Sequence, residues 1–346
     1  MTKRKMAIQT FLCMESENIN FIEIKGAIVK AVVFFDLFDY PLTLDEIWHS
    51  MSVKCELIEV IEALGNIAWK SPLPAFIKGG KVEYKNGFYF LAGRGAIVEE
   101  RLKRYNFTDR KFKRALLVAK IFKFIPWIKM MAVGNLLGAH NLRDDSDIDF
   151  FIIAEDKRIW LTRFFCTGLA KLLRLRPQAN NLRDKICLSF YVSEKAMDLS
   201  SLMLPQDSIA SLQNDSESDD IYFLYWLAGL TPLYDAGGVY HELIKANQWL
   251  FTYLPNWRPV SQVARRQVKP LASSFYRDII DLFIGGLEPQ AMALQLKLLP
   301  AQLKNLMNQD NRVVVNNKAI KLHANDRRGE YGEKFRDKIN NLSLLA

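Results

Sequence analysis

Residues 127–156 read WIKMMAVGNLLGAHNLRDDSDIDFFIIAED, and this stretch decides how the rest of the chain is interpreted. The apolar segment from Lys129 to Val133 predicts a strand that runs into Gly134-Asn135. A polar loop follows, and Asp147-Ile148-Asp149 then opens a second predicted strand with the apolar residues FFIIA. Because side chains alternate between the two faces of a strand, Asp147 and Asp149 are expected to point the same way.

Two carboxylates held this close repel each other unless a proton or a cation lies between them. Carboxylate oxygens on a rigid strand are ligands that suit Mg²⁺. The turn at Gly134, before a predicted short helix over residues 135–139, would leave backbone N–H groups facing a phosphate. The stretch therefore predicts a magnesium site beside an anion site. The alternative is a surface turn whose acids only solvate the end of a strand.

These residues resemble the nucleotidyltransferase superfamily, whose fold is shared by DNA polymerase beta and the small-molecule nucleotidyltransferases. Its signature is an apolar strand, Gly-Gly or Gly-Ser, a short loop, and Asp-x-Asp on the next strand. Here 11 residues separate Gly134-Asn135 from Asp147-Ile148-Asp149. A narrower resemblance covers most of the first 260 residues, and it is to a bacterial family that joins a winged helix to such a domain and has no assigned substrate. It is carried by FFDLFDYPLT, GFYFLAGR, the DSDIDFFII core, WLTR, KICLSFYV and ANQWLFTYLPNW.

The resemblance implies an α/β (α+β) fold and the transfer of NMP from an NTP to an acceptor hydroxyl, with release of pyrophosphate. Two Mg²⁺ ions are expected, one at the hydroxyl and one at the leaving group. Asp147 and Asp149 would be the catalytic metal ligands. The implied nucleotide-binding residues are Gly134 and Asn135, and Arg143 and Ser146 are added to them because of their place in the loop. Weaker candidates for phosphate contact, on the next predicted helix, are Lys157, Arg158 and Arg163. His140, in the loop before the aspartate pair, is either an ordinary polar loop residue or a residue that contacts substrate.

Two features depart from the signature. Asn135 stands where Ser or Gly is usual, so the backbone N–H remains but the small hydroxyl does not. The strand expected to bring a third carboxylate is Ile186 to Ser193, which has Ser189 at its centre and contains no acid. Glu194 or Asp198, beyond its end, could substitute. The alternative is a catalytically degenerate protein that binds nucleotide while its N-terminal domain docks a partner or nucleic acid.

The chain before this stretch predicts three helices and a hairpin. Helices are expected over residues 22–39, over TLDEIWHSM with a Thr43/Glu46 capping box, and over residues 55–67. Asn86-Gly87 between two β-rich runs predicts a tight hairpin turn. This order is typical of a winged helix. The predicted domains are therefore a winged helix at 20–96, a nucleotidyltransferase domain at 97–195 and a helical domain at 215–346.

A winged helix commonly binds DNA through its third helix. Here that helix carries Glu56, Glu59 and Glu62, and residues 1–90 have 10 basic and 11 acidic side chains. DNA phosphates repel such a surface. Specific DNA binding is therefore not expected.

The net charge of the 346-residue chain is +9, from 47 Lys and Arg against 38 Asp and Glu, and it is unevenly distributed. Residues 91–130 carry +8, residues 131–250 carry −5 and residues 251–346 carry +7. The first basic block is predicted to be helical, with several cations on one side: Arg110, Lys113, Arg114, Lys120 and Lys123. They form either an ordinary solvated face or a basic collar that attracts a triphosphate to the acidic centre.

The chain after residue 194 is interpreted as helical. Helices are expected near residues 220–231, 238–254, 260–285, 289–308 and 326–344. Three aromatic residues there could stack a base, although aromatics at helical spacing more often belong to a core: Trp249, Trp257 and Tyr276.

The remaining composition favours a cytoplasmic protein without a membrane segment. The four cysteines are widely separated, as in reducing compartments, at positions 13, 55, 166 and 187. No signal peptide is expected, and no uncharged run reaches the roughly 20 residues that a membrane span needs. The acceptor is left open between a small molecule, a protein hydroxyl and an RNA end.

Overall fold

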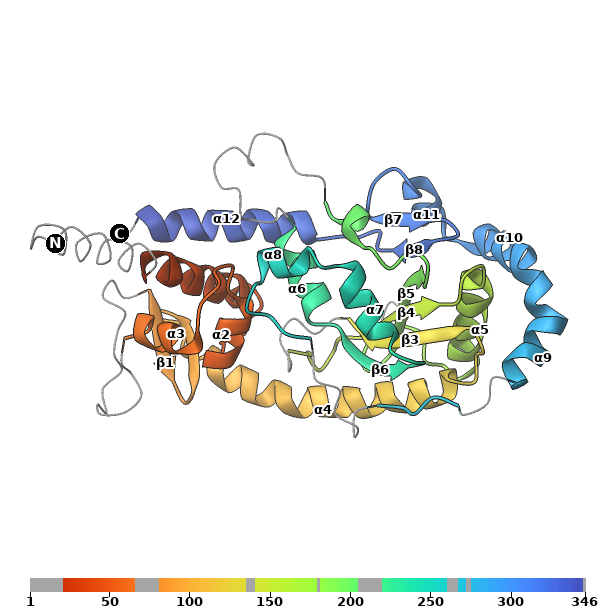
Figure 1. Ribbon diagram of the computed structural model, residues 1–346, viewed down its shortest axis with the longest axis horizontal. Helices are drawn as coiled ribbons and strands as arrows, with labels where there is room; N and C mark the ends of the chain where they lie inside the picture. The colour runs from red at the N-terminus through yellow and green to blue at the C-terminus, as the bar shows by residue number, and fades with distance from the viewer. Residues whose placement is uncertain are drawn as a thin grey trace, which may run out of the picture.

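The computed structural model describes residues 21–65, 81–134, 141–178, 181–204, 220–259, 267–271 and 275–344. The protein is a mixed α/β structure built on a six-stranded sheet with the order β6-β3-β4-β5-β8-β7 (Figure 1). A separate two-stranded sheet, β1-β2, lies near the N-terminal end of the described chain. The predicted α/β (α+β) class is confirmed at this level.

The N-terminal block contains the predicted three helices and hairpin. A helix over residues 21–36 is followed by α2 (Leu44–Ser50), α3 (Leu57–Ala63), β1 (Val82–Lys85) and β2 (Phe88–Leu91). The capping box at the start of α2 is confirmed: Thr43 N–H donates to Glu46 Oε2 at 2.8 Å, and Glu46 N–H donates to Thr43 Oγ1 at 3.3 Å. Asn86 and Gly87 have φ values of 54° and 87°, the left-handed pair that a tight hairpin turn requires.

The long helix α4 (Ile97–Phe122) connects this block to the central sheet along the lower edge of the molecule in Figure 1. Near its start, the buried Arg101 donates to both carboxylate oxygens of Glu46, at 2.6 and 2.9 Å. One helical turn later, Arg104 donates to the Phe38 carbonyl at 2.8 Å and to the side-chain oxygen of Asn141. Paired buried arginines therefore bind the N-terminal block to the loop that leads to Asp147.

The centre of the sheet consists of the strands predicted around the aspartate pair. β3 (Ile128–Val133) is antiparallel to β4 (Ile148–Ala154), and β4 is parallel to β5 (Ile186–Ser193). A parallel pair needs a crossover connection, and α5 (Ile159–Leu172) supplies it. The bounds of β5 are those predicted.

The expectation that the chain is helical after residue 194 is wrong, because three strands from this region complete the sheet. β6 (Thr231–Asp235) pairs with β3, and β8 (Ala319–Leu322) pairs with β5 and with β7 (Val313–Val315). These segments are short, and the valine run before Asn316-Asn317 is a strand signal that a search for helical periodicity passes over. The sheet therefore crosses the predicted domain boundary at residue 195.

The helices of this region otherwise lie near the predicted positions. The segment expected to be helical over 260–285 is helical only from Phe275 in its described part. The bounds are α6 (Ile221–Ala228), α7 (Val239–Ala246), α8 (Leu250–Tyr253), α9 (Phe275–Ile284), α10 (Glu288–Leu298), α11 (Ala301–Leu306) and α12 (Arg328–Leu344). α12 returns to the N-terminal helix, where Lys338 pairs with Asp36 (Figure 1).

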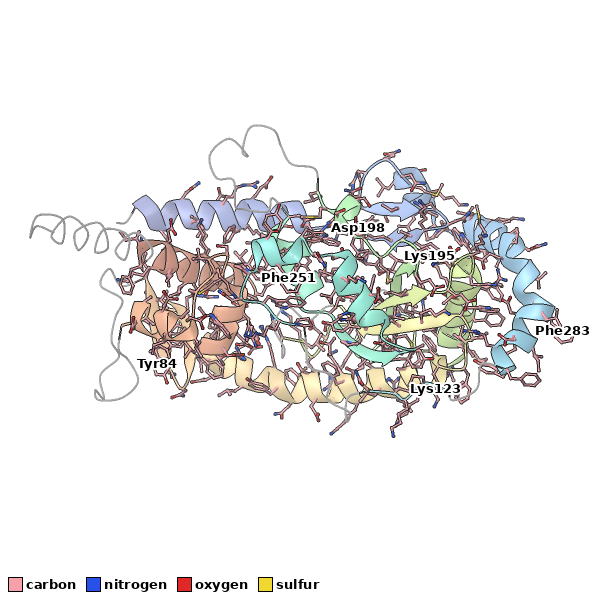
Figure 2. All side chains as sticks on the ribbon, in the orientation of Figure 1. Tyr84, Lys123, Lys195, Asp198, Phe251 and Phe283 are labelled. Carbon is pink, nitrogen blue, oxygen red and sulfur yellow. The ribbon has the colours of Figure 1, made fainter. Side chains whose placement is uncertain are left out.

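Alternate residues of the central strands enter two hydrophobic clusters, one on each face of the sheet. Met130 and Phe151 pack with the N-terminal block, α6 and α7, whereas Met131 and Ile152 pack with α4 and α5. At the far end of the molecule α9 projects outward, and its Phe283 is 77% exposed (Figure 2). Among the described helices, none is both long enough and apolar enough to cross a lipid bilayer.

Candidate functional site

The two aspartates of the Asp-x-Asp pair stand where β4 begins. Asp147 immediately precedes the strand and Asp149 is its second residue. In the parallel β4–β5 pair, Asp149 is in register with Cys187. One carboxylate oxygen of each aspartate and the Cys187 sulfur all lie within 4.8 Å of one another. The structure therefore brings the predicted pair together and adds a thiol to it.

In the absence of a cation, the surroundings of these three groups favour their protonated forms. Burial and the charge of Asp147 raise the pKa of Asp149 to about 7, although a hydrogen bond from Cys187 acts to lower it. Burial also raises the pKa of Asp147, although the charges of Lys111 and Arg176 oppose it. The pKa of the Cys187 thiol is well above its usual value because of burial and the two carboxylates. A cation placed among the three groups would relieve this repulsion.

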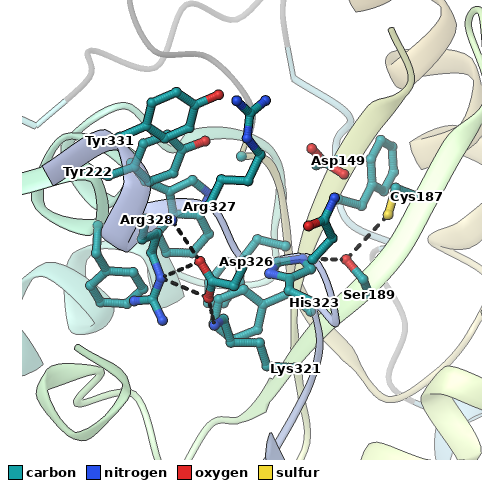
Figure 3. A pocket seen from close by; sticks show the side chains of 17 residues that line it. Asp149, Cys187, Ser189, Tyr222, Lys321, His323, Asp326, Arg327, Arg328 and Tyr331 are labelled. Carbon is teal, nitrogen blue, oxygen red and sulfur yellow. Dashed lines mark hydrogen bonds and ion pairs between the residues drawn. The ribbon is translucent and has the colours of Figure 1, made fainter. Parts of the chain in front are cut away.

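Asp149 and Cys187 open onto a cavity of about 280 Å³ (Figure 3). Its apolar wall is a stack in which the Trp226 ring lies 5.2 Å from both Phe190 and Phe223, with interplanar angles of 15° and 16°. Across the cavity from Asp149, Tyr222 and Tyr331 are stacked at 5.3 Å and 8° (Figure 3). The cavity thus places flat aromatic surfaces opposite a carboxylate cluster.

Most of the charged side chains in the cavity wall neutralise one another. Asp326 accepts from Arg328 Nε at 2.9 Å and from Lys321 Nζ at 2.8 Å, and these cations lower its pKa to about 2 despite burial. Arg328 also donates to Asp220 at 2.5 Å. Arg327 differs, because its side chain is 48% exposed and it pairs with Glu330 at 2.7 Å on the surface. Arg327 is therefore the wall cation best able to turn toward an anion.

Ser189 is a hydrogen-bond partner of the cluster. Its hydroxyl accepts from the Cys187 thiol at 3.3 Å and contacts His323 Nε2 at 2.7 Å. Burial and the charge of Lys321 lower the pKa of His323 to about 4, so its imidazole is neutral at physiological pH. The chain from Cys187 through Ser189 to His323 fixes the orientation of the thiol.

Gly134 lines the cavity, and its own N–H is already hydrogen-bonded, while the rest of the loop predicted to contact a phosphate, residues 135–140, lies outside the described residues. That N–H donates to the Asp149 carbonyl at 2.9 Å and is therefore not open to a phosphate. A glycine is required for a different reason: a Cβ atom here would lie 2.9 Å from Trp226 Nε1. Asn135 and His140 lie outside the described residues.

Gly134→Ala is therefore expected to displace Trp226 and to lower the free energy of unfolding by about 1–3 kcal/mol, the usual cost of overpacking. Trp226→Phe removes the indole nitrogen that the new methyl group would meet. The double variant should recover most of the loss, which thermal unfolding of the four proteins of this cycle measures. Additive losses in the double variant would contradict the steric explanation.

Arg143 and Ser146, the other predicted nucleotide-binding residues, do not line the cavity. The side chain of Arg143 is 61% exposed and lies 4.0 Å from Asp39, and the Ser146 hydroxyl donates to the Arg143 carbonyl at 3.0 Å. The predicted basic collar on α4 is partly neutralised, since Arg110 pairs with Asp144 at 2.6 Å and with Asp184 at 3.0 Å. A nucleotide-binding role for the loop remains a prediction.

Two of the three weaker phosphate candidates at α5 and the turn before it are hydrogen-bonded to other helices. Arg158 donates to both oxygens of Asp281, at 2.6 and 2.8 Å, and the buried Arg163 donates to Gln295 at 2.6 Å. Lys157 is a turn residue with a φ of 58°. Arg158 therefore connects the start of α5 to α9, and Arg163 connects α5 to α10.

Neither proposed substitute for the third carboxylate reaches the cluster. Glu194 follows the far end of β5, roughly 23 Å from Cys187 at about 3.3 Å per residue, and accepts the Asp156 N–H at 3.2 Å. Asp198 is exposed at the surface (Figure 2) and accepts the Ser200 N–H at 2.9 Å. The β5 position beside Asp149 belongs to Cys187 instead.

The aromatic residues proposed to stack a base do not line the cavity. Trp257 is buried and donates to the Ala228 carbonyl at 3.2 Å, and Tyr276 donates to the Phe124 carbonyl at 2.6 Å. Trp249 donates to Asn247 at 3.2 Å. Sequence reasoning missed the aromatics that do line it. The lining phenylalanines of β4 and β5, which include Phe151 and Phe190, lie on predicted strands, whereas the other lining aromatics come from the strings IYFLYW (221–226) and RRGEYG (327–332), and neither string shows that the two segments meet.

Comparison of the chain with protein-family profiles, with curated proteins and with solved structures finds no match.

Proposed function

We propose that the protein is a divalent-metal-dependent nucleotidyltransferase, which moves NMP from an NTP to an acceptor hydroxyl and releases pyrophosphate. The observation that carries the proposal is the convergence of Asp147 and Asp149 at the edge of the aromatic cavity. The raised pKa of Asp149 supports it, because a carboxylate pair that is costly to ionise alone is suited to holding a cation.

The oxygen donors of the two aspartates fit Mg²⁺, which is commonly bound by one or two carboxylates together with substrate phosphates. A divalent cation there would supply charge neutralisation for the triphosphate and a lower pKa for the acceptor hydroxyl. The chain would position the nucleotide. Aromatic stacking contributes about 1–3 kcal/mol per base, and the rings of Tyr222 and Trp226 are the available flat surfaces.

The direct test is incubation of the full-length protein with each labelled NTP and Mg²⁺, alone and with lysate fractions, followed by mass spectrometry. The expected result is an acceptor that gains the mass of one NMP while pyrophosphate appears. The three acceptor classes, small molecule, protein and RNA, separate in the same experiment. Absence of pyrophosphate with every fraction and every NTP would contradict transferase activity.

A second candidate is a protein that binds nucleotide without transferring it. It is favoured by β5, the strand from which the superfamily signature implies a third carboxylate, because β5 contains no acid and places Cys187 beside Asp149. Calorimetry distinguishes the two. Binding of an NTP with Mg²⁺, together with no turnover in the labelling experiment, would establish binding alone.

Arg327→Met is expected to weaken NTP binding about tenfold or more, because a hydrogen bond to a charged group contributes about 1.5–3 kcal/mol. The Arg327 guanidinium lies over the Tyr331 ring, 5.1 Å from its centroid, and Arg327 lines the cavity. Calorimetric titration with a non-hydrolysable NTP measures the effect. Lys334→Met, which removes the other surface cation paired with Glu330, is the control and should leave binding unchanged.

A further inference from the structure

The third group of the metal-type cluster is a sulfur atom. Cys187 lies beside Asp149 in the parallel register, and residues in register on neighbouring strands, about 4.8 Å apart, point to the same face. The backbone register therefore fixes the sulfur and the two carboxylates near one another, independently of side-chain flexibility. All three groups stand on, or next to, strands at the centre of the sheet.

The Asp149 carboxyl group lines the cavity and has no cationic partner among the described residues. In the part of the chain that the structure describes, no lysine, arginine or histidine forms an ion pair with Asp149. Of the two cations whose charge acts on Asp147, Lys111 forms an ion pair with Asp184 at 3.0 Å. A partly buried carboxylate that lines a cavity and has no cationic partner is an independent sign that a cation binds there.

We propose that Asp147, Asp149 and Cys187 form a binding site for a thiophilic divalent cation, of the class of Zn²⁺ and Co²⁺, with the Cys187 sulfur as the third protein ligand. The proposal rests on the proposed use of the two carboxylates as metal ligands and specifies the metal. Mg²⁺ takes oxygen ligands and gains little from sulfur, whereas a thiolate strongly favours Zn²⁺ and its relatives. As the metal–sulfur bond forms, the thiol releases its proton to solvent.

The geometry requires only a small contraction. Bonds of about 2.0–2.3 Å place the ligands of a tetrahedral ion about 3.3–3.8 Å apart, so atoms now within 4.8 Å must approach by about 1 Å. Three protein ligands leave the fourth position open toward the cavity, as in catalytic rather than structural zinc sites. The Ser189 hydroxyl, which contacts His323 at 2.7 Å, lies 3.3 Å from the sulfur and would help to orient it.

The test is titration of the full-length wild-type protein with Co²⁺, followed by absorption spectroscopy. We expect one Co²⁺ per chain and a near-ultraviolet thiolate-to-cobalt band. The band should be lost in Cys187→Ser and kept in Cys55→Ser, the matched control, because Cys55 is a free cysteine of the N-terminal block that does not line the cavity. In Cys187→Asp the band should also be lost, and Mg²⁺ affinity should rise at least about tenfold, because the third ligand becomes an oxygen.

A measurement on the wild-type protein alone keeps the proposal testable if a variant does not fold. X-ray absorption of the Zn²⁺-loaded protein should show one sulfur at about 2.3 Å. A shell of oxygen and nitrogen only, or equal cobalt spectra in wild type and Cys187→Ser, would overturn the sulfur ligand while leaving transferase activity with Mg²⁺ untouched. Conversely, absence of transfer with every metal would refute the proposed function even if the thiolate band is present.

Discussion

Asp149→Asn should abolish nucleotide transfer, lowering its rate by about 1000-fold or more. The carboxylate is one of the two oxygen ligands proposed for the metal, and amide oxygen is a far weaker ligand for a divalent cation. A loss of that size corresponds to about 4 kcal/mol of transition-state stabilisation, within the several kcal/mol that a bound metal supplies. The rate of pyrophosphate release, once an acceptor is identified, measures it.

The same substitution should make the metal-free protein more stable at alkaline pH. The pKa of Asp149 is about 7 in the folded protein, above the ordinary carboxyl value of 3.8. The folded state therefore holds this proton more tightly than the unfolded state, and stability falls as pH rises from about 4 to about 7. Above pH 7 the full penalty is present in the wild type and absent in Asp149→Asn, where we expect a gain on the order of 2–4 kcal/mol.

Thermal unfolding at pH 4 and pH 8, in buffer treated with a chelator, measures this difference. The gain should be present at pH 8 and disappear at pH 4, where the wild-type carboxyl is protonated. Asp145→Asn is the matched control, because it removes the same charge from an exposed residue of the same DSDID region and should change neither transfer nor stability. A variant that is inactive and also destabilised at pH 8 would indicate that Asp149 has a structural role instead.

The parts of this site that sequence predicts are the local ones. The aspartate pair, the end of β3 before Gly134 and the bounds of β5 follow from short strings, since strand alternation acts over a few residues. The contact between Asp149 and Cys187 depends on the register of two parallel strands, which the packing of α5 sets and no short string contains. The need for glycine at 134 likewise depends on a long-range contact, since a Cβ there would meet Trp226 on a helix distant in sequence.

The cavity wall was missed for a related reason. It combines α6 with the segment between β8 and the start of α12, far apart in sequence. The neighbouring arginines of that segment, Arg327 and Arg328, look identical in sequence, yet burial gives them different roles. Only the three-dimensional structure shows that one pairs at the surface while the other is enclosed.

Arg328→Met should therefore destabilise the protein by about 3–5 kcal/mol, the usual cost of breaking a buried ion pair from one side. The Arg328 guanidinium donates to Asp220 at 2.5 Å, to Asp326 at 2.9 Å and to the Leu202 carbonyl at 3.0 Å. Asp220 caps the N-terminus of α6 by accepting the Phe223 N–H at 3.0 Å. Loss of the arginine leaves two buried carboxylates without their main counter-ion, and a lower midpoint in urea or thermal unfolding should result.

The acid side of the stability profile should change as well. The pKa of Asp326, about 2 in the folded protein, is below the ordinary 3.8, so this group stabilises the fold above pH 4 and the contribution is lost as pH falls toward 2. In Arg328→Met the remaining partner is Lys321, and the fall in stability between pH 4 and pH 2 should be shallower than in the wild type.

Arg327→Met is the matched control, because it removes the same charge one residue earlier. Arg327 pairs with Glu330 at the surface, where an ion pair contributes about 1 kcal/mol or less. The stability of Arg327→Met should therefore stay close to that of the wild type, while its NTP binding weakens. Arg328→Met should instead lose much more stability than Arg327→Met does. Equal destabilisation by the two variants would mean that the ion network around Asp220 does not hold α12 to α6, and that the cavity wall is maintained by apolar packing alone.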